Sequence, residues 1–302
     1  MAALRRFTPT PRFLARPSVR ELPACSVQSR FAPFRCSLKS PRPTRRAVLL
    51  AGLTAAGSLL FPQRATAETW AVREWVGQIE VRSEVAYDGR LAEAIAELAP
   101  LRAELERTFG LTFPNSPIEL NVFASRRTYT EYLSVRVPGG ASRAALFVDG
   151  VDRDRVYTVN SRQVGIDVRH ECTHAFLHSR LPYVPLWLDE GLAEYFEVPS
   201  PERIAGHTHL RTLRRPGFVF WRPNLQRLEA LRDLADMGAD EYREAWAWTH
   251  FMLNGPQPAR AVLQRYVASI AAGDFSGKLH PQLAAAVGDP EAALKKYVRQ
   301  IR

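Results

Sequence analysis

The sequence predicts an α+β fold, with a mixed sheet and its helices first and a mainly helical half after it. Alternating apolar and polar residues recur between residues 70 and 160, which is the spacing of half-buried strands. From residue 161 onward, apolar residues return every three or four positions, which predicts amphipathic helices. Residues 68–302 are of a length that suits one domain, with a sheet-rich half (68–160) and a helical half (161–302).

The sheet-rich half is predicted to alternate strands and helices. Strands are expected at residues 70–87, 118–123, 144–148 and 156–159. A helix is expected at 91–109, where leucines recur at helical spacing, Pro100 can introduce a kink and Gly110 can cap the end. Ser125 is expected to cap a second helix.

The helical half is predicted to begin with two helices joined by a short link. The first contains residues 170–177 and the second residues 190–196, and Pro182 and Pro185 lie between them. Further helices are expected at 224–235, 240–253, 259–271 and 291–301. The last two are amphipathic and are expected to close the core.

The strongest chemical signal is the run His170-Glu171-Cys172-Thr173-His174. On a helix, His170 and His174 lie one turn apart on one face, so both can bind one Zn²⁺ at about 2.0–2.1 Å. Glu171 can reach a water molecule activated by the metal, which is the position of a general base. The alternative is a solvated helix face that carries two histidines by chance. The apolar continuation Ala175-Phe176-Leu177 argues against it.

A catalytic zinc ion needs a third protein ligand, and Glu190 is the candidate. It opens the returning helix, which can bring its carboxylate back against the first helix. His178 continues the row of His170 and His174, but eight residues advance about 12 Å along a helix. We therefore expect His178 to be a pocket wall or a surface residue.

These residues carry a resemblance. His170-Glu171-x-x-His174 followed by Pro185-Leu186-Trp187-Leu188-Asp189-Glu190-Gly191-Leu192-Ala193-Glu194-Tyr195 resembles the gluzincin metallopeptidases. The pattern is most similar to the peptidase-MA-like group, with aminopeptidase N and thermolysin as more distant relatives. The resemblance implies a zincin-like fold, zinc on His170, His174 and Glu190, and Glu171 as the base. Glu194 falls where thermolysin-like enzymes have an acidic residue that braces a ligand histidine; the alternative is a surface glutamate.

The resemblance also implies a donor to the oxyanion, which in gluzincins is a tyrosine or histidine downstream of the zinc site. Tyr242 is the candidate and His250 the alternative, both on the helix expected at 240–253. Tyr242 can equally be a packing residue. In zincins the edge of the sheet borders the cleft, and residues 144–148 are our expected edge strand.

The function implied is a zinc-dependent peptidase acting on a peptide or protein substrate. The aminopeptidase signature G-x-M-E-N is absent, which favours an endopeptidase. One alternative is a catalytically silent, zinc-stabilised binding or assembly protein, against which the intact Glu171 argues. Another is a zinc hydrolase of a non-peptide amide, which would use identical machinery. The oligomeric state stays open.

The net charge of +10 does not indicate a nucleic-acid partner. Residues 1–67 contain 12 Lys and Arg and a single acidic residue, Glu21, which leaves 29 basic and 30 acidic residues for the rest. The basic charge therefore belongs to the leader and not to a binding face.

The leader, residues 1–67, is predicted to consist of two targeting segments. Residues 1–44 are rich in Arg, Ser and Pro, as in an organelle transit peptide. Residues 45–67 join Arg45-Arg46 to a short apolar run and Ala65-Thr66-Ala67, which is typical of a cleaved twin-arginine signal. Together they predict the chloroplast thylakoid lumen, with no stable membrane anchor after cleavage. The alternatives are a bacterial twin-arginine signal, for the periplasm or export, and an uncleaved anchor.

The remaining candidates are a thiol and a histidine pair. Cys25 and Cys36 lie in the leader, so Cys172 alone would remain and no intramolecular disulfide is expected. His207 and His209 form an H-x-H pair in a loop-like stretch. We expect a solvated or substrate-side role for them. The alternative is a second metal site, since on a strand both side chains would share one face.

Overall fold

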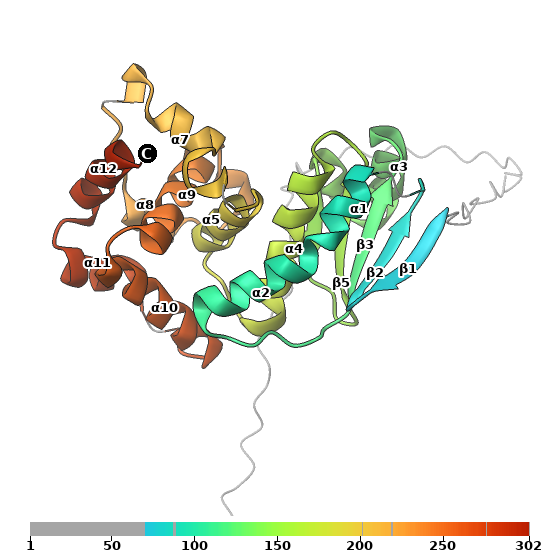
Figure 1. The fold of residues 1–302 in the computed structure, drawn as a ribbon, viewed down its shortest axis with the longest axis horizontal. Helices are drawn as coiled ribbons and strands as arrows, with labels where there is room; N and C mark the ends of the chain where they lie inside the picture. Colours follow the sequence, from blue (N-terminus) through green and yellow to red (C-terminus); the bar gives the residue numbers. More distant parts are fainter. Residues whose placement is uncertain (1–69, 87–88, 201, 219, 276, 302) are drawn as a thin grey trace, which may run out of the picture. The chain divides into compact units, whose positions relative to one another are not determined.

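The sheet of the computed structural model has the strand order β1-β2-β3-β5-β4. Residues 70–86, 89–200, 202–218, 220–275 and 277–301 are described by the structure (Figure 1). The two targeting segments predicted at 1–44 and 45–67 lie outside these residues. Within them, no helix combines the length and the apolar character needed to cross a membrane.

The sheet is mixed, with its most buried strand in the middle. β2 (Ile79–Ser83), β3 (Ile118–Phe123) and β5 (Asp154–Val159) run parallel to one another. β1 (Val72–Val76) and β4 (Leu146–Val148) are antiparallel additions at the two edges. All six residues of β3 are buried, because helices cover both of its faces. The structure thus confirms the predicted α+β class.

Two predicted elements are divided in the structure. The strand predicted at 70–87 is a hairpin, because Gly77 adopts a φ of +60° and turns the chain between β1 and β2. The helix predicted at 91–109 is two helices, α1 (Gly89–Ala96) and α2 (Leu98–Phe109). Pro100 lies in the first turn of α2, where a missing N–H costs little. Gly110 caps α2 with a φ of +64°, as predicted.

Two layers of helices enclose the sheet. α1 and α4 (Val164–Arg180) cover one face, where the apolar residues of β3 join the main core, and α2 continues from α1 past α4 toward α10 (Gln257–Ala271) (Figure 1). α3 (Arg126–Arg136) covers part of the other face, over a small cluster around Phe123 and Tyr157. As predicted, the Ser125 hydroxyl caps α3 by accepting a hydrogen bond from the backbone N–H of Thr128.

The helical half follows α4. Its α-helices are α5 (Leu186–Phe196), α6 (Glu202–Ala205), α7 (Thr208–Leu213), α8 (Leu225–Ala230), α9 (Ala239–Asn254), α10 (Gln257–Ala271), α11 (Leu279–Val287) and α12 (Pro290–Gln300). Short 3₁₀ turns occur at Gly140–Ser142, Pro216–Phe218 and Leu234–Asp236. The helix predicted at 224–235 is therefore shorter than expected, and α11 was not predicted.

α5 is held between α4 and α9, and this fixes the face that it turns to α4. Gly191 allows the close approach to α9: a Cβ there would lie 2.5 Å from the Thr249 hydroxyl and 2.7 Å from the carbonyl oxygen of Ala245. At the far end of α5, the buried Arg169 of α4 donates a hydrogen bond of 3.0 Å to the carbonyl oxygen of Phe196. These contacts orient the polar side of α5 toward α4.

We predict that Gly191→Ala lowers the free energy of unfolding by about 1–3 kcal/mol, because the added methyl overlaps the backbone of α9. Gly165→Ala in α4 is the matched control, since its Cβ would have Ala94 as its nearest neighbour at 4.0 Å. That variant should be unchanged or stabilised by up to about 1 kcal/mol. Chemical denaturation measures both. Equal stability of the two variants would contradict the close packing of α5 on α9.

Candidate metal centre

α4 presents the H-E-x-x-H residues on one side and a buried apolar side on the other. Val168, Cys172 and Phe176 are fully buried in the core. His170, Glu171 and His174 line a cavity of about 220 Å³ between α4, α5, α9 and β4. The prediction that these three residues lie on one helix is confirmed, since α4 spans all of them. Cys172 is a free buried thiol, and burial raises its pKa well above the usual value.

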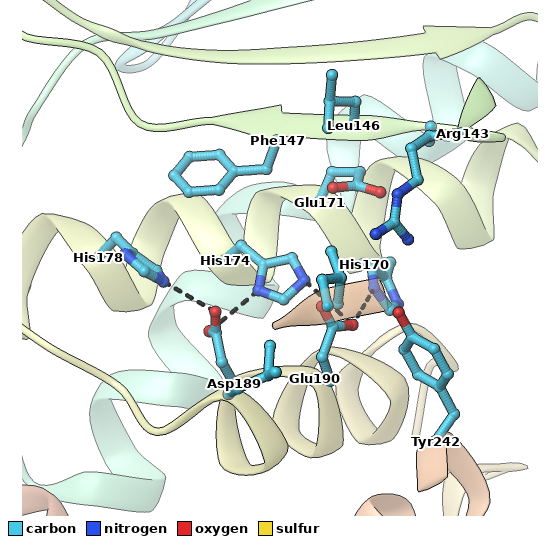
Figure 2. Close-up of a pocket in the computed structure, with 13 residues that line it drawn as sticks. Arg143, Leu146, Phe147, His170, Glu171, His174, His178, Asp189, Glu190 and Tyr242 are labelled. Carbon is cyan, nitrogen blue, oxygen red and sulfur yellow. Dashed lines mark hydrogen bonds and ion pairs between the residues drawn. The ribbon is translucent and has the colours of Figure 1, made fainter. Parts of the chain in front are cut away.

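The three predicted ligands come together across α4 and α5. The Glu190 Oε2 atom lies 3.6 Å from Nε2 of His170 and 3.9 Å from Nε2 of His174 (Figure 2). In a tetrahedral zinc site with bonds of 2.0–2.1 Å, ligand atoms lie about 3.3–3.4 Å apart. The three atoms therefore need only small movements to hold one ion. Two imidazoles and a carboxylate are also a donor set that zinc commonly takes.

The other nitrogen of each ligand histidine faces a carboxylate. Nδ1 of His170 lies 3.0 Å from Oε2 of Glu197, and Nδ1 of His174 lies 3.0 Å from Oδ1 of Asp189. A neutral imidazole that donates its proton from Nδ1 keeps a lone pair on Nε2. Both lone pairs then face Glu190. This pattern of carboxylate, histidine and metal position is the one that orients ligands in zinc proteins.

Glu194 does not occupy the bracing position predicted for it. Its carboxylate accepts a hydrogen bond of 2.9 Å from Nε2 of His209, and Glu197 holds the ring of His170 instead. Glu190, Glu194 and Glu197 follow one another at i, i+4 and i+7, so all three face the same side of α5. The spacing could have drawn attention to Glu197, but it could not choose between the two carboxylates.

The H-x-H pair lies behind this site and not in solvent. His207 is buried, and its Nε2 donates to Oε1 of Glu197 over 3.3 Å. Its Nδ1 accepts a hydrogen bond of 3.2 Å from the backbone N–H of His209, at the start of α7. The ring of His207 stacks on Trp246 of α9, with centroids 4.8 Å apart. A solvated role is therefore wrong for His207, because this loop folds back against α5 and α9. Neither histidine is among the described residues that line the cavity, so the structure does not place them on a substrate side.

Two other groupings of acidic residues and histidines occur around the same rings. One is His174, His178 and Asp189, and the other is His170, Glu194 and Glu197. His178 is a cavity wall, as predicted, and its Nε2 lies 2.9 Å from Oδ2 of Asp189. The Asp189 oxygens lie 3.0 Å from His174 and 2.9 Å from His178, and Glu197 lies 3.0 Å from His170, distances that suit a shared proton. The wider spacing around Glu190 suits an ion.

The charges of the site favour a cation. Burial opposes the charged form of both ligand histidines, but the neighbouring carboxylates outweigh it. The pKa of His170 is held well above its usual value, and that of His174 rises to about 9. Despite its burial, Asp189 has a pKa below the usual range because His174 and His178 adjoin it. A divalent ion would replace the protons on the two Nε2 atoms, and the same carboxylates would then balance the charge of the ion.

Glu171 lies on the cavity wall, on the same side of α4 as the three predicted ligands (Figure 2). Burial raises the pKa of its carboxyl group, while the histidines of the site lower it in part. A carboxylate with a raised pKa is a better proton acceptor near neutral pH.

Of the two predicted oxyanion donors, the structure brings Tyr242 to the cavity. Its hydroxyl points toward His170, and the side chain of Arg143 lines the same part of the cavity (Figure 2). His250 does not line the cavity. Its Nε2 donates to the carbonyl oxygen of Ile204 over 3.0 Å, and its Nδ1 lies 2.9 Å from the hydroxyl of Tyr297. It lies eight residues after Tyr242 on α9, on the side that packs into the core.

The site residues to which the sequence assigns no role are Asp189, Glu197 and Arg143, while His207 and His209 are expected elsewhere from the sequence. Asp189 directly precedes Glu190, and Glu197 follows it by two helical turns. No family model matches this sequence, and neither does any curated protein.

We predict that Asp189→Asn and Glu197→Gln each weaken zinc binding by about 10–100-fold, because each ligand ring loses the carboxylate that fixes its tautomer. The matched control is Asp240→Asn, on an exposed residue of α9 paired with Arg243. Competition with a chromophoric chelator gives the dissociation constants. Zinc affinities within twofold of the unchanged protein would contradict the orienting role of these carboxylates.

We predict that His250 makes the metal-free protein less stable in mild acid. Burial lowers its pKa to about 4, whereas an unfolded histidine titrates near 6.5. The unfolded chain therefore binds a proton first as the pH falls, so stability is lost between about pH 6.5 and pH 4. Between pH 7 and pH 5, the free energy of unfolding of the unchanged protein should fall by about 2 kcal/mol more than that of the His250→Gln variant.

Urea denaturation with a chelator present measures this difference. His280→Gln is the control, because His280 lies near the surface and contacts Glu291. It should retain most of the wild-type dependence on pH. The same loss of stability in His250→Gln as in the unchanged protein would show that His250 is not the group responsible.

Proposed function

We propose that the protein is a zinc-dependent peptidase of the gluzincin type, with a zincin-like fold, that cleaves internal peptide bonds. The observation that carries the proposal is Glu171. It lies on the cavity wall beside the Nε2 atoms of His170 and His174 and the Glu190 carboxylate. A site that only stabilised the fold would need neither a cavity nor a base beside it.

A zinc ion on His170, His174 and Glu190 would supply Lewis-acid catalysis, polarising a carbonyl group and lowering the pKa of water. Glu171 takes up the proton of the attacking water and later gives it to the leaving amine. Its burial supports this exchange, since the raised pKa lies closer to the working pH. Asp189 and Glu197 hold the two imidazoles in position throughout.

The remaining walls of the cavity suit a peptide. The Tyr242 hydroxyl can donate a hydrogen bond to the oxygen that gains negative charge as water attacks. β4 lies at the edge of the sheet, and Leu146 and Phe147 of this strand line the cavity. An extended peptide can pair with the free edge of such a strand. This edge favours a peptide over a small non-peptide amide, which would use the same zinc residues.

The test is Glu171→Gln beside the unchanged protein, both loaded with zinc and incubated with a mixed peptide library read by mass spectrometry. We expect one zinc per chain in both proteins and cleavage by the unchanged protein alone, because glutamine binds no proton in this range. Glu131→Gln, on an exposed residue of α3, is the control and should cleave normally.

Retained cleavage by Glu171→Gln would contradict the assignment of the base. Zinc in both proteins without cleavage by either would favour the zinc-stabilised binding or assembly protein. No zinc in either protein would contradict the ligand set.

A further inference from the structure

Arg143 is a cavity residue that the mechanism above does not use. It belongs to the loop directly before β4, and its guanidinium group points into the cavity between Glu171 and Tyr242 (Figure 2). Among the described residues that line the cavity, it is the one with a permanent positive charge. The described residues that form salt bridges do not include it.

The loop that carries Arg143 is fixed from behind. The guanidinium group of Arg126 in α3 donates hydrogen bonds to the backbone carbonyl oxygens of Ala141, Arg143 and Ala144. Gly140 packs so closely that a Cβ there would lie 2.8 Å from the side chain of Leu146. Arg143 is thus presented to the cavity from a braced backbone, as a residue that selects a ligand should be.

Two of the three carboxylates that line the cavity face histidines, and the third, Glu171, forms no salt bridge with Arg143. Asp189 contacts His174 and His178, and Glu190 faces the two ligand histidines. The Arg143 guanidinium group has five N–H donors, and no salt bridge of the described residues uses them. Guanidinium groups form their strongest contacts with carboxylates, often through two parallel hydrogen bonds.

We propose that Arg143 binds a carboxylate group of the substrate, so that the site selects acidic peptides. This inference rests on the proposed peptidase function and names its substrate class. The carboxylate can come from an acidic side chain near the bond that is cleaved or from the C-terminus of the peptide. Both sources offer the same chemistry, and the experiment separates them.

The first measurement is binding and needs no turnover. The full chain carrying Glu171→Gln is loaded with zinc and titrated by calorimetry with acetohydroxamate and with succinic acid monohydroxamate, which adds a carboxylate. We expect the second probe to bind at least about 10-fold more tightly. Adding Arg143→Met should abolish this preference and leave acetohydroxamate within about twofold. Arg143→Lys should keep part of it, and Arg127→Met, on an exposed arginine of α3, should keep all of it.

If Arg143→Met weakened the binding of both probes equally, the proposal would be overturned. Arg143 would then act on the hydroxamate group that both probes share, and not on the carboxylate. Absence of a preference before Arg143 is changed, or failure of both probes to bind the zinc-loaded protein, would overturn it as well. Thermal melting of each variant shows that it is folded, and Arg143→Lys preserves the test if the methionine variant is not.

The second measurement identifies the source of the carboxylate. Three peptides are compared: one with an acidic side chain and an amidated C-terminus, one with neutral side chains and a free C-terminus, and one neutral and amidated. Loss of kcat/KM by about 10-fold or more in Arg143→Met for either of the first two, with the third unaffected, supports the proposal and names the source. An equal loss for all three overturns it. If no peptide is cleaved, the peptidase function fails, and the binding measurement still decides the role of Arg143.

Discussion

The contacts between Nδ1 of each ligand histidine and a carboxylate of α5 are the constraint on which the rest of the site depends. Without them, either ring could turn or carry its proton on Nε2, and the lone pairs would no longer face Glu190. α5 and the residue that caps its C-terminus supply all three carboxylates: Asp189 and Glu197 contact the rings, and Glu190 faces their Nε2 atoms. The position of α5 against α4 therefore determines whether the site forms.

That position comes from packing far from the chemistry. Gly191 lets α5 approach α9, and Arg169 joins the end of α5 to α4. His207, stacked on Trp246, holds Glu197 from the other side. The sheet contributes the opposite wall of the cavity through β4 and the loop that carries Arg143. The sheet-rich half thus forms one wall of the cavity, and the helical half carries His170, His174, Glu190 and Tyr242.

The parts of the site that sequence could predict are those where chemistry demands a residue type at a fixed spacing. His170, Glu171, His174 and Glu190 belong to this class, and so do the helices that carry them. Either Glu194 or Glu197 could contact His170, depending on how far α5 extends along α4. The spacing of the residues in the sequence does not determine this distance. The places of His207 and His250 depend on side-chain packing around Trp246 and Tyr297. In the fold, the hairpin of β1 and β2 escaped prediction because the strand-like alternation continues across Gly77.

The most direct test of the central claim is a crystal structure of the zinc-loaded protein with anomalous diffraction collected at the zinc edge. We predict one strong peak bounded by Nε2 of His170, Nε2 of His174 and the Glu190 carboxylate, with both Nδ1 atoms still on their carboxylates. A peak between His174, His178 and Asp189, or between His170, Glu194 and Glu197, would contradict this assignment of the ligands. So would a fully zinc-loaded crystal with no peak at Glu190.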